Sequence, residues 1–214
     1  MKNKKHYCGG VLISEKFVLT AAHCLEGYKE SDVEVRLGEF DFKSEDDGLP
    51  EDYVVISIVR HTQFDPFTYR NDIALLKLDR SATANEYTHP ICLPNPNLDY
   101  TGLVGIVAGW GSLSYGGVSS DVLRQVSLPI WNNSECDTKF SQAITHHYLC
   151  AGVRQGKEDS CQGDSGGPLM IEGRNNRWMV VGIVSWGVRC ADTGFPGVYT
   201  RITEYLQWIK FHMV

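Results

Sequence analysis

The sequence predicts an all-β fold, and three observations support this prediction. Short apolar or β-branched runs recur along the 214 residues, and residues 33–37 alternate strictly between apolar and polar, as a half-buried strand does. Clusters of Gly, Pro, Asn and Asp separate the runs, and the 21 glycines suit many tight turns. Long helical patterns are nearly absent. Short strands with frequent turns are typical of β-barrels and β-sandwiches.

Six strands are expected, five before residue 111 and one near residue 180. In order, the runs occupy residues 8–13, 33–37, 54–59, 73–78, 105–110 and 179–186. Turn-forming residues bound each run, which predicts separate strands. A short helical turn is expected after His23.

The C-terminus is the one place where a longer helix is expected, from Thr203 to about Met213. Thr203 can cap its first turn, and Glu204 suits the positive end of the helix dipole. Leu206, Ile209 and Met213 fall on one face at helical spacing. This pattern favours a packing helix over a functional element.

Composition excludes several classes of protein. Hydrophobic residues make up 43% and charged residues 21%, an ordinary globular balance, and the formal net charge of −6 disfavours nucleic-acid binding. No apolar run reaches the ~18–20 residues that a membrane span needs. Glu15 and Lys16 break the apolar stretch from Val11 before it becomes a signal core. We therefore expect the chain to follow an upstream region.

Cysteine usage predicts an oxidising, extracellular compartment. The chain has seven cysteines and no Cys-x-x-Cys pair, which weakens zinc-ribbon and thioredoxin-like interpretations. Asn132 begins the N-glycosylation sequon Asn132-Asn133-Ser134, although a chance polar turn explains the same residues. An odd cysteine is left over, and Cys92 lacks an obvious local partner. It is either a buried free thiol or a tether to another segment, and we favour the tether.

Three motifs carry the chemistry, in the order His, Asp, Ser. They are Thr20-Ala21-Ala22-His23-Cys24, Asn71-Asp72-Ile73-Ala74-Leu75-Leu76 and Gly163-Asp164-Ser165-Gly166-Gly167-Pro168. A Ser hydroxyl is a weak nucleophile that needs a base within hydrogen-bond reach, and the base needs an orienting acceptor. His23 suits the base and Asp72 the acceptor. Each motif alone could be an ordinary turn, but their joint occurrence resembles the chymotrypsin-like (trypsin family) serine proteases from Cys8 to Val214.

The resemblance implies a fold of two antiparallel six-stranded Greek-key β-barrels with a C-terminal α-helix and the site between the barrels. We expect about residues 1–95 in the first barrel, about 105–202 in the second and 203–214 in the helix. It also implies the disulfides Cys8–Cys24, Cys136–Cys150 and Cys161–Cys190, a pairing that the spacing alone does not establish.

The resemblance assigns the catalytic roles to His23, Asp72 and Ser165. It places the oxyanion donors on the amides of Gly163 and Ser165, and such donors stabilise the charge that develops during acyl transfer. Ser185-Trp186-Gly187 resembles the strand that pairs with a bound peptide. In the family, the serine of this strand also contacts the carboxylate of the triad.

Asp159 determines the expected specificity, because in the family this position lies at the floor of the primary pocket. A carboxylate buried there needs a cation, and Arg or Lys supplies one. Ser160 adds a hydroxyl, and Gly187 and Gly197 match wall positions that must be small. The alternative, a solvated loop charge, agrees poorly with the register Asp-Ser-Cys-Gln-Gly-Asp-Ser.

The chain departs from the family at its beginning, which lacks an Ile-Val-Gly-Gly-like start. In the family, the ammonium freed by zymogen cleavage pairs with the Asp before the nucleophile, here Asp164. As written, the sequence thus lacks its activation switch. It is either a piece of a longer secreted precursor, which we favour, or a short form with little activity.

The carboxylate-rich loop at residues 39–48 predicts a structural Ca²⁺ site, because Ca²⁺ prefers oxygen ligands and the family has a calcium loop near here. Glu39, Asp41 and Asp47 are the expected ligands. A solvated acidic loop explains the same residues. No cofactor is required for the expected chemistry.

The function expected from these residues is that of a secreted trypsin-like endopeptidase in a zymogen cascade. Cys92 in Pro90-Ile91-Cys92-Leu93-Pro94 and the ending at residues 203–209 resemble arthropod clip-domain and clotting-cascade proteases. This resemblance implies an upstream regulatory region held through Cys92, a zymogen substrate and serpin-type inhibitors. The alternatives are a non-catalytic homologue that acts as a binding module, and a digestive trypsin, which would not need the tether.

Overall fold

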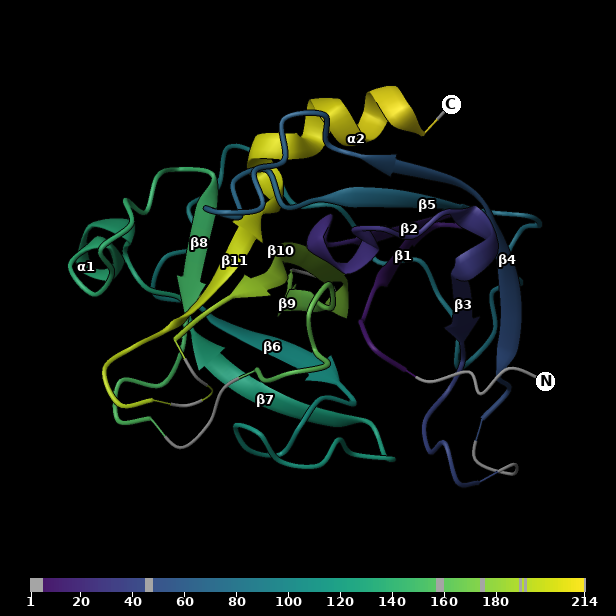
Figure 1. The fold of residues 1–214 in the computed structure, drawn as a ribbon, viewed down its shortest axis with the longest axis horizontal. Coiled ribbons are helices and arrows are strands. Elements are labelled where there is room, and N and C mark those ends of the chain that lie inside the picture. The colour runs from purple at the N-terminus through teal and green to yellow at the C-terminus, as the bar shows by residue number, and fades with distance from the viewer. Residues whose placement is uncertain are drawn as a thin grey trace.

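The structure is a computed structural model that describes residues 6–44, 48–156, 160–173, 176–188, 190 and 192–213. Two curled antiparallel sheets lie side by side, and a helix at the C-terminal end crosses the top of the view in Figure 1. The predicted all-β fold with a C-terminal helix is therefore confirmed.

The first sheet has five strands in the order β1-β2-β5-β4-β3. These strands are β1 (Val11–Ser14), β2 (Phe17–Thr20), β3 (Glu34–Leu37), β4 (Glu51–Arg60) and β5 (Ala74–Leu78). The resemblance implied six strands here. The long strand β4 pairs with β3 along its first half and with β5 along its second, across a bulge between Val55 and Ser57. Because a bulge bends a strand, β4 contributes to both halves of the curled sheet.

The second sheet has six strands, as the resemblance implied, in the order β7-β6-β9-β10-β11-β8. They are β6 (Val104–Gly109), β7 (Arg124–Pro129), β8 (Tyr148–Ala151), β9 (Pro168–Glu172), β10 (Trp178–Trp186) and β11 (Gly197–Arg201). The chain between the sheets passes beside β10, where Cys92 forms an isolated parallel bridge with Met179.

The helices of the described residues are short, and none is long and apolar enough to cross a membrane. They are η1 (His23–Leu25), η2 (Glu30–Asp32), α1 (Asn133–Asp137), η4 (Ile202–Tyr205) and α2 (Leu206–His212). The turn expected after His23 is η1. The expectation that Thr203 caps the C-terminal helix is wrong, because residues 202–205 form a 3₁₀ turn and α2 starts after Tyr205. Tyr205 is buried and hydrogen-bonded to Asn71, which fixes this first turn.

The C-terminal helix belongs to the core of the first sheet, although it follows the second sheet in the chain. Leu206 and Ile209 are buried in the same apolar cluster as Leu19 and Leu75, and Met213 packs against it. Separate clusters fill the second sheet. The helix therefore ties the end of the second sheet to the first.

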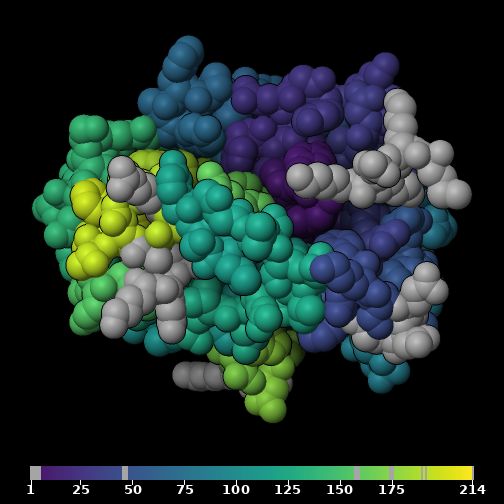
Figure 2. Space-filling view, turned by 60° about the horizontal axis from the view of Figure 1, so that its bottom comes forward, coloured from purple at the N-terminus to yellow at the C-terminus, as the bar shows by residue number. Residues whose placement is uncertain are grey.

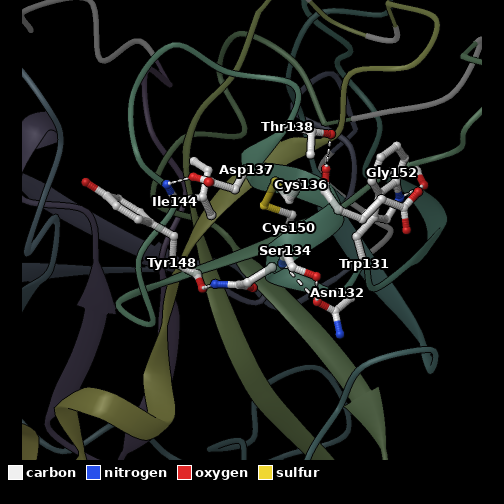
Figure 3. The surroundings of a disulfide bond; sticks show 12 residues. Trp131, Asn132, Ser134, Cys136, Asp137, Thr138, Ile144, Tyr148, Cys150 and Gly152 are labelled. Atoms are coloured by element: carbon white, nitrogen blue, oxygen red, sulfur yellow. Dashed lines mark hydrogen bonds between the residues drawn. A yellow bond between two sulfur atoms is a disulfide. The ribbon is translucent and has the colours of Figure 1, made fainter.

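Three disulfides close local loops, and they are the pairs that the resemblance implied: Cys8–Cys24, Cys136–Cys150 and Cys161–Cys190. Figure 3 shows that the second of these joins α1 to β8. Cys92 is a half-buried free thiol in the structure.

We predict that Ile209→Ala lowers the free energy of unfolding by ~2–5 kcal/mol, because it opens a cavity at a side chain with no exposed surface. Gln207→Ala, on the exposed side of α2, is the control and should change stability by less than ~0.5 kcal/mol. Urea denaturation of both variants measures the difference. Equal midpoints would show that the helix does not contribute to the core.

Candidate active site

His23 is held at two points by one carboxylate. It begins η1, three residues after β2 ends at Thr20, and its backbone N–H donates to Oδ1 of Asp72 at 2.9 Å. Its ring Nδ1 lies 2.7 Å from Oδ2 of the same residue. An ionised carboxylate only accepts, so Nδ1 carries the proton and Nε2 is left to take one. The imidazole is 17% exposed, whereas Asp72 is fully buried.

The second sheet completes the surroundings of Asp72. The Ser185 hydroxyl of β10 donates to Oδ2 at 2.5 Å, and the Thr200 hydroxyl of β11 donates to the Asp72 carbonyl at 2.7 Å. Both hydroxyls are buried. A buried charge is stable only when it is paired and hydrogen-bonded. Asp72 meets this condition through groups from both sheets.

Asn71 fixes the backbone that carries Asp72. Its φ of +58° is left-handed, a conformation that Asn adopts more readily than most residues. Its amide nitrogen donates to the Gln63 carbonyl at 2.8 Å, and its oxygen accepts from the Tyr205 hydroxyl at 3.0 Å. Burial is the main cause of a raised pKa for Tyr205, so this hydroxyl keeps its proton.

Ser165 lies on a tight segment that packs against the motif of His23. The Ser165 carbonyl accepts from the Gly9 amide at 2.7 Å. The next residue, Gly166, has a φ of +79°, and a Cβ on it would lie 2.3 Å from Oγ1 of Thr20 and 3.2 Å from the amide of Ala21. Only glycine fits this approach. The fold thus brings the serine segment beside the residues that lead into His23.

The two amides expected to bind an oxyanion are free to do so. Gly163 has a φ of +100°, which turns the backbone just before Ser165. Within the described residues, the Asp164 amide is bound by the Cys161 carbonyl, whereas the Gly163 and Ser165 amides donate to no group of the chain. Two unbound amides on either side of a turn can stabilise a developing negative charge.

The residues expected to meet a peptide lie at the end of β10. Ladder pairs between β9 and β10 reach only Ile183, so Ser185-Trp186-Gly187 extends beyond them. Trp186 packs edge-to-face on Phe140, with ring centroids 5.1 Å apart. Gly187 faces Gly197, because a Cβ on Gly187 would lie 3.7 Å from the Gly197 Cα.

Asp159, the residue expected to determine specificity, lies outside the described residues. Its neighbour Ser160 is described, and the Ser160 hydroxyl lies 3.0 Å from the hydroxyl of buried Tyr199 on β11.

Asp164 is a carboxylate enclosed by glycines. It accepts from the amides of Gly111 and Cys161 at 2.9 Å each. A Cβ on Gly109 or Gly111 would lie within 2.1–2.5 Å of it. Burial raises the pKa of Asp164, against the lowering effect of these amides and of His6. No ion pair to Asp164 within 4.0 Å exists among the described residues.

The expected calcium loop lies against a segment of the second sheet. Figure 2 shows a dark-blue segment beside the central teal one. The Phe42 amide donates to the Asp121 carbonyl, between β6 and β7, at 3.0 Å. Glu39 accepts from Arg36 at 3.1 Å and from its neighbour's amide, and Asp41 accepts from the Lys43 amide. Asp47 lies outside the described residues. The two described candidates fit Ca²⁺ poorly because a guanidinium already binds one of them, and the calcium site stays a prediction.

One other group of ligand types gathers in the described residues: Cys8, His23 and Cys24. The two sulfur atoms form a disulfide, so they cannot act as thiolate ligands.

Sequence reasoning missed three residues that bear on this site: Tyr69, Thr200 and Tyr205. Tyr69 places its ring 5.3 Å from the His23 ring at an angle of 69°, and its φ is +57°. Its only sequence signal was its position two residues before Asn71. Thr200 lies in β11, which the sequence analysis did not identify, and Tyr205 lies in the segment expected to be a packing helix, so nothing marked their hydroxyls.

Two antiparallel sheets that share a buried aspartate paired with a histidine, and a Gly-Asp-Ser-Gly segment packed on the residues before that histidine, are typical of chymotrypsin-like serine proteases. Comparison with known proteins agrees. The pattern of the family described as Trypsin matches residues 1–209, and the chain belongs to this family.

Similar proteins include a proclotting enzyme, a serine proteinase and a trypsin. The chain is 43% identical to a proclotting enzyme of Tachypleus tridentatus over 97% of its residues, and 41% identical to serine proteinase stubble of Drosophila melanogaster. It is 41% identical to trypsin I-P1 of Gallus gallus, of which it covers 80%. The chain spans only 58% of the first relative and 27% of the second.

We predict that Asp164→Asn changes the pH dependence of stability. A folded pKa above the unfolded value means that the folded state binds more protons between the two values, so stability falls as pH rises through that window. Because Asn does not titrate, Asp164→Asn does not show this fall in stability. Its melting temperature relative to the parent chain should therefore rise as pH increases from about 4, the ordinary value for an unfolded Asp, toward the raised folded value.

Asp99→Asn is the control of opposite sign, because hydrogen bonds from Thr101 lower the pKa of Asp99. The stability that Asp99 contributes is present above its unfolded pKa and is lost on acidification. The melting temperature of Asp99→Asn relative to the parent chain should therefore fall as pH rises. Parallel melting curves for Asp164→Asn and the parent would contradict the prediction.

Proposed function

We propose that this chain is the catalytic part of a secreted serine endopeptidase that cleaves protein substrates after Arg or Lys. The observation that carries the proposal is the double contact of His23 with buried Asp72, next to the Ser165 segment that packs on Thr20 and Ala21. Membership of the trypsin family supports it, since the family implies protein substrates.

In the proposed reaction, the Ser165 hydroxyl attacks the scissile carbonyl while Nε2 of His23 takes its proton. Asp72 holds the opposite nitrogen and stabilises the imidazolium. The amides of Gly163 and Ser165 bind the oxyanion. Collapse of the tetrahedral species breaks the C–N bond, and the imidazolium returns the proton to the leaving amine. Water then repeats the sequence on the acyl-enzyme and regenerates Ser165. No cofactor takes part.

Specificity for Arg or Lys rests on Asp159, with Ser160 beside it and Gly187 and Gly197 as walls. The approach of Gly187 to Gly197 leaves no side chain at either wall, which suits a long substrate side chain. An Arg guanidinium matches a carboxylate with two parallel hydrogen bonds.

Activation is proposed to act on Asp164. A new ammonium terminus, made by cleavage of a precursor, would neutralise this half-buried carboxylate, which among the described residues accepts from two backbone amides and feels the charge of His6. Ordering of the neighbouring Gly163 and Ser165 amides would follow.

The proposed role is a step in a zymogen cascade such as clotting or innate immunity, with serpin-type inhibitors. A relative named proclotting enzyme supports this role. The half-buried thiol of Cys92 is suited to hold an upstream regulatory segment by a disulfide. Secretion is supported by the three disulfides. Asn132 is exposed, and only its side-chain oxygen is used, as the cap of α1, so its amide nitrogen is available for a glycan (Figure 3).

We predict that a fluorophosphonate probe labels the activated protein at Ser165, because His23 and Asp72 activate this hydroxyl. Ser165→Ala abolishes labelling and peptide cleavage, and Ser134→Ala, at an exposed serine, changes neither. Mass spectrometry locates the modified residue. If the probe does not label the activated protein, the result would instead support a non-catalytic homologue that acts as a binding module.

We also predict that Asp159→Ser lowers kcat/KM for substrates with Arg before the cleaved bond by about 10²–10⁴, the effect of removing one partner from a desolvated charge pair. Substrates with Leu at that position should change by less than about threefold. Glu26→Gln, an exposed acid, is the control. Equal losses for both substrate types would argue that Asp159 does not contact the substrate.

A further inference from the structure

Three polar groups form a closed triangle between the two halves of the molecule. The Thr68 carbonyl accepts from Nε2 of Gln142 at 2.6 Å and from the Tyr148 hydroxyl at 2.9 Å. The same Gln142 nitrogen donates to the Tyr148 hydroxyl at 3.1 Å. We call Thr68, Gln142 and Tyr148 the Thr68 latch. Thr68 precedes β5 of the first sheet, whereas Tyr148 begins β8 of the second.

Donor and acceptor roles in the Thr68 latch are fully determined. A carbonyl cannot donate, so Gln142 must present its nitrogen to it, and the hydroxyl must point its only hydrogen at it as well. The second amide hydrogen of Gln142 then meets the lone pair of the hydroxyl. The carbonyl uses both lone pairs. Each group therefore fits the other two in a single arrangement.

Tyr148 is buried within the Thr68 latch, so the loss of its hydrogen bonds would lower stability. Tyr148 is 3% exposed, and its ring meets the Trp186 ring edge-to-face with centroids 6.1 Å apart. Figure 3 shows the ring extending away from the Cys136–Cys150 disulfide. Burial is the main cause of a raised pKa for Tyr148, so the hydroxyl stays a donor. A buried donor or acceptor that loses its partner is costly.

The Thr68 latch restrains Tyr69, the residue that follows Thr68 in the chain. Tyr69 has a φ of +57°, which is unusual for a bulky side chain and persists only where its surroundings impose it. Its amide donates to the Asp65 carbonyl at 2.8 Å, and the Thr68 hydroxyl donates to the Asp65 carboxylate at 2.7 Å. Asp65 thus fixes this loop from within, and the latch fixes it from the opposite sheet. The Tyr69 ring, so held, stands against His23.

We propose that Gln142 and Tyr148 are positioning residues for the proposed proteolysis: through the Thr68 carbonyl they hold the Tyr69 ring against the His23 imidazole. The expected effect on substrate selectivity rests on the proposed function, whereas the positioning of the Tyr69 ring does not. The ring forms a rigid wall beside the base, so the latch determines which substrate side chains fit next to it. Loss of the latch leaves the strained Tyr69 free to relax away from His23.

The first test needs no catalytic activity. Tyr148→Phe keeps the ring on Trp186 but removes two of the three hydrogen bonds. The ring current of Tyr69 shifts the His23 ring protons, so their NMR chemical shifts should move in Tyr148→Phe in the same direction as in Tyr69→Ala. Tyr100→Phe is the matched control: Tyr100 is also 3% exposed and makes two hydrogen bonds, both with Asn95. Unchanged His23 shifts in a folded Tyr148→Phe protein would overturn the proposal.

The second test uses the activated enzyme and peptides that differ only in the residue before the Arg or Lys. We expect Tyr148→Phe to lower kcat/KM about fivefold to tenfold, mainly through KM, and to reduce selectivity between small and bulky residues there. In a Tyr69→Ala background the same substitution should have no further effect on selectivity. If Tyr148→Phe still reduced selectivity in the Tyr69→Ala background, the latch would not act through Tyr69. An enzyme that fails the fluorophosphonate test but shows the NMR shifts would refute the proposed function and leave the latch standing.

Discussion

The buried carboxylate of Asp72 is the constraint on which the candidate site depends. It has no exposed surface, and a charge in that position is tolerated only if donors surround it. His23 approaches from the first sheet and Ser185 from the second. Neither half alone can satisfy Asp72, so the docking of the sheets and the assembly of the site are one event.

Several contacts then keep the two sheets in that arrangement. The Thr200 hydroxyl binds the Asp72 carbonyl, and Tyr205 binds Asn71. The helix α2 leaves the second sheet and inserts Leu206 and Ile209 into the core of the first. The Thr68 latch adds a polar contact on the loop before Asp72. Each of these contacts restrains the backbone within a few residues of the aspartate, which is why the loop can hold left-handed Tyr69 and Asn71.

The sequence was sufficient to predict six of the eleven strands (β1, β3, β4, β5, β6 and β10) and the order of the motifs, because period-two alternation and turn residues are local signals. The strands β2, β7, β8, β9 and β11 were not predicted from their own residues. The disulfide pairs and the second sheet agreed with what the resemblance implied. The Thr203 cap was wrong because Tyr205 is pulled toward Asn71, a tertiary contact with no local signal. Tyr148 and Gln142 were missed for the same reason: they lie 80 and 74 residues from Thr68.

Asp72 is fully buried and Asp164 is partly buried, and their hydrogen-bond partners differ. Asp72 has an imidazole and a serine hydroxyl in contact with its oxygens. Asp164 has two backbone amides and no ion pair among the described residues, and burial raises its pKa. The first acid is satisfied by the fold itself. The second keeps a free-energy deficit that a cation could remove, and the turn it belongs to also carries Gly163 and Ser165. A charge supplied at Asp164 would thus lie one peptide bond from each of Gly163 and Ser165, whose amides are the proposed oxyanion donors.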